Sequence, residues 1–263
     1  MADSFYEPDG ADRFLSMPET IGPWDSTLQH AGPPSALLAR AFERLSPELL
    51  VRRLTVELLR PIPIAPLTVR AEVVRAGKRA QWLAGVLLHD GREVARATGL
   101  AIRPVAVMLP EHPRPQPGLP SPDVSKGFVF PFFLTKVGYH TAMELRIAKG
   151  EWSKGPCGAW LRMRVPLVAG ESPSPLQRVV VAADAGNGVS VTIPIDRFTF
   201  INADLTVHLH REPAGEWIGL DAVTVPENDG TGLQHSLLPD ARGVVGRSLQ
   251  TLVVSSRSAP VSP

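Results

Sequence analysis

A short segment that occurs twice constrains this chain more than any other feature of its sequence. Residues 55–60 read TVELLR and residues 206–211 read TVHLHR, 151 residues apart, and a proline closely follows each copy. A second pair of similar segments keeps the same separation between Arg96 and Arg247. Because this period is far longer than that of a stacked repeat, we expect one domain that has been duplicated and fused. The alternative is a chance likeness between strands, since β-hairpins share turn residues.

The charge balance and the cysteine count exclude several classes of protein. The 263 residues include 27 Lys and Arg against 26 Asp and Glu, a net charge of +1 that offers no electrostatic footprint for nucleic acid or an anionic membrane. The single cysteine, Cys157, rules out an internal disulfide and a multi-cysteine metal site, and it favours a reducing compartment. The chain shows neither a signal peptide nor a long apolar run, so we expect a cytoplasmic protein with no nucleic-acid or membrane partner.

The first half of the chain has the pattern of a helix followed by strands. Two prolines stand at a helix start, and apolar residues then recur with a helical period, which predicts a helix over 33–45. Four segments with strand composition follow, over 51–59, 67–74, 81–89 and 93–102. An Asp-Gly pair, which is a strong hairpin signal, separates the last two. We therefore expect an N-terminal domain over 1–104, in which an antiparallel meander covers a central helix.

A proline-rich stretch separates the first half from the second. Residues 105–127 hold too many prolines for a helix or an interior strand and are predicted to be a linker. A C-terminal domain is expected over 128–258, with a tail over 259–263. Apolar alternation within 200–225, interrupted by a proline and a glycine, predicts a β-hairpin. Further strands are predicted over 128–133, 143–147 and 159–166.

A second helix is predicted where a capping signal precedes an apolar stripe. Residues 174–177 read SPLQ, with Ser at the N-cap and Gln at the third helical position, the pattern of a capping box. The run GNG at 186–188 is expected to end this helix. Asp184 lies in the last turn on the same face as the apolar stripe, where a carboxylate is a candidate general base. The alternative is a solvent-facing Asp at a frayed helix end.

A central helix covered by an antiparallel sheet, present twice, is typical of an α+β protein with the double hot-dog fold, in which two antiparallel sheets each wrap around a central helix. At 182–184 (AAD), 202–204 (NAD) and Gln250 the second half resembles the TesB-like type II acyl-CoA thioesterase family, and the likeness covers almost the whole chain. In that family a helix Asp, a Thr or Ser near the next strand and a Gln on the last strand hold the water that attacks the thioester. The resemblance implies Asp184, Asn202 and Gln250 as catalytic residues, with Asn202 departing from the family's hydroxyl residue.

The resemblance implies an acyl-CoA thioesterase that hydrolyses a fatty or related acyl-CoA without metal or organic cofactor, and that forms a homo-oligomer. Asp184 would take a proton from water, which Asn202 and Gln250 would orient. The offset of 151 residues places Val51 and Gly99 where the second half has Asn202 and Gln250, so we expect one active site per chain. The rival hypothesis is a non-catalytic protein that binds acyl-CoA or another acyl ligand in the same channel.

Further residues are expected to bind the substrate: Gln29, His30, Gly32, Gly186 and Asn187. The loop before the first helix is expected to border the ligand channel; a hot-dog dehydratase would place a histidine there, but its longer motif is missing. His208 and His210 share a strand face, yet no third ligand has a recognisable spacing, so no metal site is expected. Cys157 has no histidine at an informative spacing and is expected to be structural.

Overall fold

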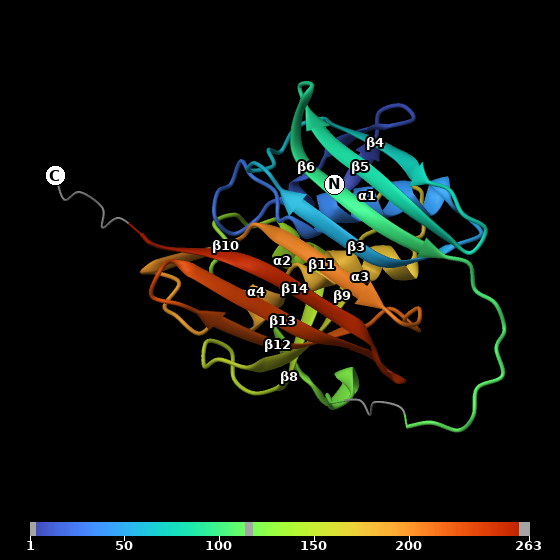
Figure 1. The fold of residues 1–263 in the computed structure, drawn as a ribbon. Helices are drawn as coiled ribbons and strands as arrows, with labels where there is room; N and C mark the ends of the chain where they lie inside the picture. The colour runs from blue at the N-terminus through green and yellow to red at the C-terminus, as the bar shows by residue number, and fades with distance from the viewer. Residues whose placement is uncertain (1–3, 114–117, 258–263) are drawn as a thin grey trace.

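The computed structural model describes residues 4–113 and 118–257, and its strands form one large antiparallel sheet curved around a few helices (Figure 1). The order across the sheet is β1-β2-β4-β5-β6-β3-β11-β14-β13-β12-β9-β8-β7, and β10 pairs with β14. The strands of the first half are β1 (Tyr6–Pro8), β2 (Arg13–Ser16), β3 (Leu50–Leu58), β4 (Leu67–Arg75), β5 (Ala80–His89) and β6 (Arg92–Ile102). Those of the second half are β7 (Lys126–Phe128), β8 (Met143–Lys149), β9 (Cys157–Met163), β10 (Phe198–Asn202), β11 (Asp204–Leu209), β12 (Ile218–Pro226), β13 (Thr231–Asp240) and β14 (Gly243–Ser256).

The strands of the two halves, predicted as two antiparallel sheets, join edge to edge into one continuous sheet. β3 of the first half pairs with β11 of the second, with Thr55 opposite Thr206, and the Thr206 hydroxyl donates to the Thr55 hydroxyl at 3.2 Å. Pairing these two strands satisfies the backbone groups that two free edges would expose. The offset of 151 residues then relates the halves strand by strand: Gln234 lies opposite Gln250 as Leu83 lies opposite Gly99.

The helices lie against one side of the sheet and against each other. They are α1 (Gly32–Leu45), α2 (Tyr139–Ala142), α3 (Pro175–Ala183) and α4 (Gly186–Val189), with short 3-10 turns at Pro18–Thr20 and Pro122–Val124. α1 packs on β3, β4 and β5, whereas α3 packs on β9, β11, β12 and β13. The first predicted helix and the four strands that follow it are confirmed to within two residues. Close contact between α1 and α3 depends on Gly32, because a Cβ there would lie 2.6 Å from the Val181 carbonyl oxygen.

The predicted hairpin over 200–225 is wrong. β11 has β3 and β14 as its neighbours, and β12 lies between β13 and β9, so the two strands do not pair. Arg211 and the amide of Ala214 in the connection both bind the Asp240 carboxylate at the far end of β13, which carries the chain away from β11. The alternation is confirmed within β11, where Leu205, Val207 and Leu209 are buried.

One predicted strand, 128–133, is a loop in all but its first residue, and another, 159–166, ends earlier than expected. β7 ends at Phe128, and residues 129–133 form a loop instead of the rest of a strand. Pro131 lies inside this segment and lacks the amide that a sheet ladder requires. Phe130, Phe132 and Phe133 instead pack on one another with ring centroids 5.4–6.3 Å apart. β9 likewise ends at Met163, three residues before Pro166.

The second helix begins as predicted but continues differently. The Ser174 hydroxyl accepts from the Gln177 amide at 3.1 Å, which confirms the cap. The Gln177 side chain does not complete the capping box; it donates to Glu43 on α1 at 2.9 Å. α3 ends at Ala183, and residues 186–188, which were predicted to end the helix, instead lie in the short helix α4. Gly186 is needed for packing, because a Cβ there would lie 2.5 Å from Nε2 of Gln234.

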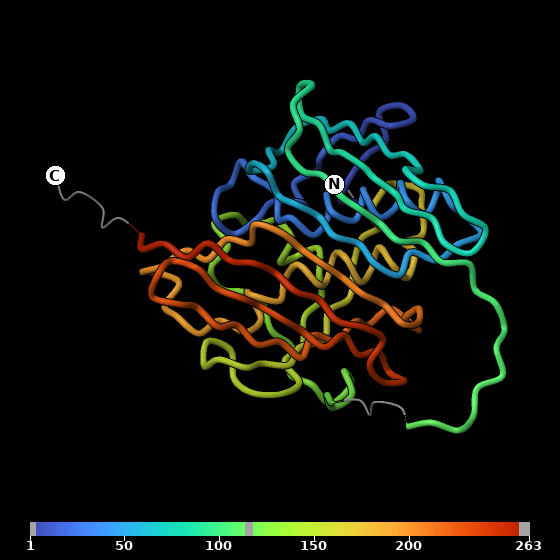
Figure 2. The backbone as a smooth tube through the Cα atoms, in the orientation of Figure 1, coloured from blue at the N-terminus to red at the C-terminus, as the bar shows by residue number. Residues whose placement is uncertain are grey.

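The connection between the halves leaves β6 and runs along one side of the molecule (Figure 2). Residues 103–113 have no regular secondary structure, and 114–117 of the predicted linker lie outside the described residues, as does the predicted tail 259–263. From Leu119 onward the chain is packed on the second half, since the Trp160 indole donates to the Pro120 carbonyl at 2.6 Å. No helix within the two described ranges has the length and apolar character needed to span a membrane.

Candidate active site

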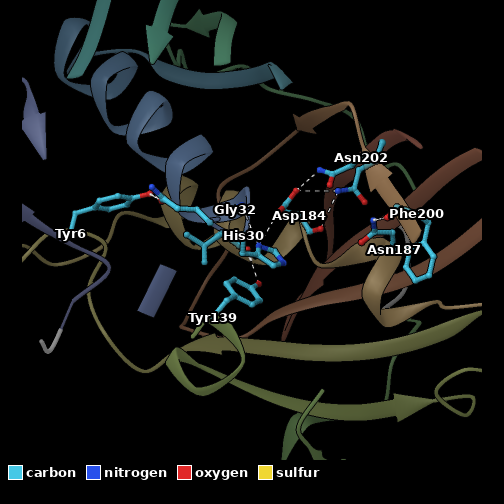
Figure 3. Close-up of polar contacts among 11 residues, drawn as sticks. Tyr6, His30, Gly32, Tyr139, Asp184, Asn187, Phe200 and Asn202 are labelled. Atoms are coloured by element: carbon cyan, nitrogen blue, oxygen red, sulfur yellow. Dashed lines mark hydrogen bonds and ion pairs between the residues drawn. The ribbon is translucent and has the colours of Figure 1, made fainter. Parts of the chain in front are cut away.

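Asp184 lies at the centre of a cluster of polar side chains that the two halves build together (Figure 3). Its side chain is 3% exposed, which excludes the alternative of a solvent-facing residue at a frayed end. Asn202 Nδ2 donates to Oδ1 at 2.6 Å, and Gln250 Nε2 donates to the same oxygen at 3.2 Å and to the Asp184 carbonyl at 3.0 Å. His30 Nδ1 lies 2.8 Å from Oδ2. The carboxylate is thus held by donors on both oxygens.

Four separate elements bring these groups together. Asp184 is the C-cap of α3, Asn202 is the last residue of β10, and Gln250 lies on the fully buried inner face of β14. His30 comes from the first half, two residues before α1 begins. Because Gly32 lets the start of α1 approach the end of α3, the imidazole of one half reaches the carboxylate of the other.

His30 is fixed by stacking as well as by its contact with Asp184. Its ring lies parallel to that of Tyr139, with centroids 3.6 Å apart and an interplanar angle of 2°. The Tyr139 hydroxyl donates to the Val181 carbonyl at 2.8 Å, and burial, with the nearby Asp184 charge, raises the pKa of that hydroxyl well above its usual range. Nδ1 of His30 is also 3.3 Å from the Gly32 amide, but the shorter contact with a carboxylate places the proton on Nδ1.

A cavity of about 310 Å³ opens beside the cluster. Asp184, Asn202, His30 and Asn187 line it, whereas Gln250 does not. The rest of the wall is mainly apolar and rich in aromatic rings, with Trp24, Phe130, Phe132, Phe133, Phe200, Leu28, Leu58, Leu59, Ile62, Ile201 and Val253. The site therefore presents a held carboxylate to a space suited to an apolar group.

Comparison with known proteins identifies the family. The model of the acyl-CoA thioesterase N-terminal domain matches residues 20–102, and that of the acyl-CoA thioesterase C-terminal domain matches residues 110–254. The chain belongs to the acyl-CoA thioesterase family. It is accordingly a thioester hydrolase, and the predicted resemblance is confirmed. No curated protein matches the sequence.

Solved structures similar to this thioesterase share its hot-dog fold. A conserved protein of unknown function with a hot-dog fold from Alicyclobacillus acidocaldarius has a TM-score of 0.71 and 19% identity, covering 97% of this chain and 96% of its own. An acyl-CoA thioesterase II, TesB2, from Mycobacterium marinum has a TM-score of 0.68 and 14% identity, covering 96% of each chain. A tesB protein from Mycobacterium avium subspecies paratuberculosis has a TM-score of 0.67 and 16% identity, covering 95% of each.

The five residues expected to bind substrate in this thioesterase divide into two groups. Gln29, His30 and Asn187 line the cavity. The side-chain oxygen of Gln29 also accepts a hydrogen bond from the buried Tyr6 hydroxyl at 2.6 Å. Gly32 and Gly186 do not line the cavity. Both glycines instead allow close packing, because a side chain at either position would meet backbone or side-chain atoms within 2.6 Å.

Two features of the thioesterase site were not predicted from the sequence. The contact of His30 with Asp184 joins residues 154 positions apart, and no local pattern records such a contact. The aromatic wall was partly visible as a dense run of Phe at 128–133, but that run was taken for a strand. The other candidates stay outside the site: Cys157 is buried in the core and the His208 side chain is exposed on β11.

The electrostatic surroundings of the thioesterase cavity are mixed. Arg60 and Asp25 both line it, and the Arg257 guanidinium lies 5.4 Å from the centroid of the Trp24 ring. Two hydrogen bonds from Thr27 lower the pKa of the Asp25 carboxyl. Among the residues that the structure describes, no three His, Cys, Asp or Glu side chains gather in a way that could hold a metal ion. The groups at hand are a carboxylate, an imidazole and amides, which suit proton transfer from water.

Proposed function

We propose that this protein hydrolyses an acyl-CoA to a free acid and CoA by attack of a water molecule activated at Asp184. The observation that carries the proposal is a buried carboxylate at the wall of an apolar cavity, fixed by Asn202, Gln250 and His30. Thioester hydrolysis requires a base that takes a proton from water beside an acyl group, and this arrangement supplies both.

In the proposed reaction, Oδ2 of Asp184 accepts a proton as the water oxygen bonds to the thioester carbonyl carbon. The carbon–sulfur bond then breaks, and the proton passes to the sulfur of the departing CoA thiolate. Asn202 lines the cavity and orients the water through its amide, whereas Gln250, which does not line it, holds Asp184 in place. His30 keeps Oδ2 directed toward the cavity.

The proposed substrate is a fatty or related acyl-CoA whose acyl group enters the aromatic cavity. Five of the cavity residues are Trp or Phe, and such walls favour apolar groups over polar ones. Arg60 at the wall and Arg257 over Trp24 give the phosphates of CoA two cationic partners. No organic cofactor or metal enters the proposed reaction.

The match to acyl-CoA thioesterase domains disfavours the rival hypothesis of a non-catalytic acyl-CoA-binding protein, and the second candidate is a slow hydrolase that mainly binds its ligand. Asn202 supports it, because the resembling family has a hydroxyl residue at this place and an amide already committed to Asp184 has fewer hydrogen bonds to offer water.

We further propose a double hot-dog arrangement with one active site per chain, in a cytoplasmic homo-oligomer. The order β3-β6-β5-β4 of the first half is repeated as β11-β14-β13-β12 in the second at the 151-residue offset, and each half packs on its own helix. At the position equivalent to Gln250, the first half has Gly99, where a Cβ would lie 2.7 Å from the Phe42 ring. Phe42 therefore fills the space that the polar cluster occupies in the second half.

The test is thiol release from a panel of short, medium, long and aromatic acyl-CoAs, together with equilibrium binding of each. Turnover of at least one member is expected, with saturation kinetics. Binding of the panel without any thiol release would reject the proposed hydrolysis of these acyl-CoAs, and very slow thiol release would favour the second candidate. Failure to bind any member would reject both.

A further inference from the structure

The inner face of the second half-sheet carries polar side chains where the first half has apolar ones. Gln234 lies opposite Gln250 across β13 and β14, and Ser236 lies opposite Ser248 two residues further along. The equivalent pairs of the first half are Leu83 with Gly99 and Gly85 with Ala97. We call Gln234, Ser236, Ser248 and Gln250 the polar layer. These four side chains belong to the interior, because each is at most 1% exposed.

Three buried polar atoms of the polar layer have no hydrogen-bond partner among the described residues. Gln234 Nε2 donates to the Ser236 hydroxyl at 2.7 Å, and Gln250 Nε2 donates to Asp184. Oε1 of Gln234, Oε1 of Gln250 and Oγ of Ser248 are fully buried with no partner among the described residues. Such atoms in folded proteins are satisfied by ordered water when protein groups do not reach them.

The layer touches the proposed active site at two points. Gln250 donates to the carbonyl and the carboxylate of Asp184. Gln234 packs on Gly186, two residues further along the chain, where a Cβ would lie 2.5 Å from its Nε2. On the other side of Gln234, Thr224 of β12 is satisfied by Ser190 at 2.7 Å. The backbone at Asp184 and at Gly186 therefore rests on carboxamides of the layer.

We propose that Gln234 and Ser248 are positioning residues which, with buried water bound between them and Gln250, fix the carboxamide of Gln250 against Asp184. This inference rests on the proposed function for its kinetic consequence, but the water site itself does not. A carboxamide with an unsatisfied oxygen is free to turn, whereas one whose oxygen accepts from bound water keeps its Nε2 on Asp184. The first half, which has no carboxylate at this place, fills the same volume with apolar side chains and Phe42.

The water site is tested by a crystal structure of the full chain at a resolution that shows ordered water. We expect at least one water within hydrogen-bond distance of Oε1 of Gln234 and of Oε1 of Gln250 or Oγ of Ser248. A layer that is dry in the native protein would overturn the proposal. This result does not depend on turnover, so it separates the proposal from the proposed function.

The positioning role is tested by Gln234→Leu and Ser248→Ala, which place the residues of the first half in the second. We expect kcat to fall about tenfold or more in Gln234→Leu while KM stays within about twofold, since the change acts on Asp184 and not on binding. The matched control is Gln177→Leu, which removes a buried carboxamide on α3 that bonds Glu43. It is expected to lower thermal stability and leave kcat unchanged.

Coupling to Gln250 distinguishes positioning from a loss of packing. If Gln234 acts through Gln250, adding Gln234→Leu to Gln250→Leu lowers kcat no further, so the two effects are not additive. If Gln234→Leu fails to fold, the same comparison is made with Ser248→Ala, the smaller change, alone and combined with Gln250→Leu. Unchanged kcat in folded Gln234→Leu and Ser248→Ala, or additive losses in the double variant, would overturn the proposal.

Discussion

At the scale of single residues, the central group is a carboxylate whose surroundings come from four elements. Asp184 receives hydrogen bonds from Asn202 and Gln250 and a contact from His30, which is itself stacked on Tyr139. The sequence predicted Asp184, Asn202 and Gln250 by resemblance, and the structure brings all three together. It did not predict the partner of Oδ2, because a histidine and an aspartate from different halves leave no shared local pattern.

His30→Phe removes the donor to Asp184 and keeps a ring that can stack on Tyr139. A hydrogen bond to a charged group contributes about 1.5–3 kcal/mol, so we expect kcat to fall about 10- to 100-fold. The measurement is steady-state thiol release, with binding of a non-hydrolysable acyl-CoA analogue determined in parallel. His208→Phe, on the exposed face of β11, is the matched control and should leave both quantities unchanged. Equal kcat in His30→Phe and the native protein would show that Asp184 does not depend on the imidazole.

At the scale of elements, the closeness of α1 and α3 decides whether the site exists. Sequence patterns predicted both helices, the Ser174 cap of α3 and the strands that follow α1, because periodicity and capping are local properties. They failed for the segment after Phe128 and for the pairing of β11 with β12. In the first case tertiary packing of aromatic rings replaced a strand. In the second, Asp240 and Arg211 determined the path of the chain from far along the sequence.

Gly32→Ala is expected to force α1 and α3 apart, because the new Cβ would lie 2.6 Å from the Val181 carbonyl oxygen. We expect a loss of stability of about 1–3 kcal/mol from overpacking and a fall in kcat as His30 moves from Asp184. Urea unfolding and thiol release measure the two effects. Gly127→Ala, where a Cβ meets nothing within 4 Å, is the matched control. Native stability in Gly32→Ala would contradict this account of the helix contact.

Asp240 is expected to make folding sensitive to acid. Burial acts to raise the pKa of its carboxyl, but Arg211 and the amides of Ala214 and Arg242 outweigh burial and hold that pKa below its usual range. Its contribution to stability is therefore complete above the unfolded-state pKa of about 4 and is lost as the pH falls through the folded-state pKa.

The measurement is the free energy of unfolding between pH 7 and pH 3. Asp240→Asn should be less stable at pH 7 and should show a shallower decline with acid than the native protein. Asp90→Asn, whose side chain is 88% exposed, is the control and should follow the native curve. Parallel curves for the native protein and Asp240→Asn would refute the assignment.

At the scale of the whole molecule, two similar halves share one sheet, and three of the four residues in the Asp184 cluster belong to the second half. The repeat predicted this symmetry, since the 151-residue offset is preserved in the strand pairings from Thr55 and Thr206 outward. The difference between the halves was predicted only in part, from Gly99 in place of Gln250. In the first half, the Phe42 ring packs against Gly99, at the position equivalent to Gln250. This is a contact between distant residues, so an alignment of the two halves does not reveal it.

One binding site per chain is the expected stoichiometry. Calorimetric titration of the full chain with a non-hydrolysable acyl-CoA analogue should saturate at one equivalent per chain, because Phe42 occupies the equivalent space in the first half. Saturation at two equal equivalents would contradict this division between the halves.

The most direct test of the account is the effect of Asp184→Asn on an acyl-CoA that the native protein hydrolyses. This change keeps the shape of the side chain and removes the base, so we expect kcat to fall about 100- to 10,000-fold while the dissociation constant of the non-hydrolysable analogue stays within about threefold. Asp229→Asn, in an exposed turn where it bonds Thr231, should keep native kcat. A folded Asp184→Asn protein with native kcat would contradict the central claim.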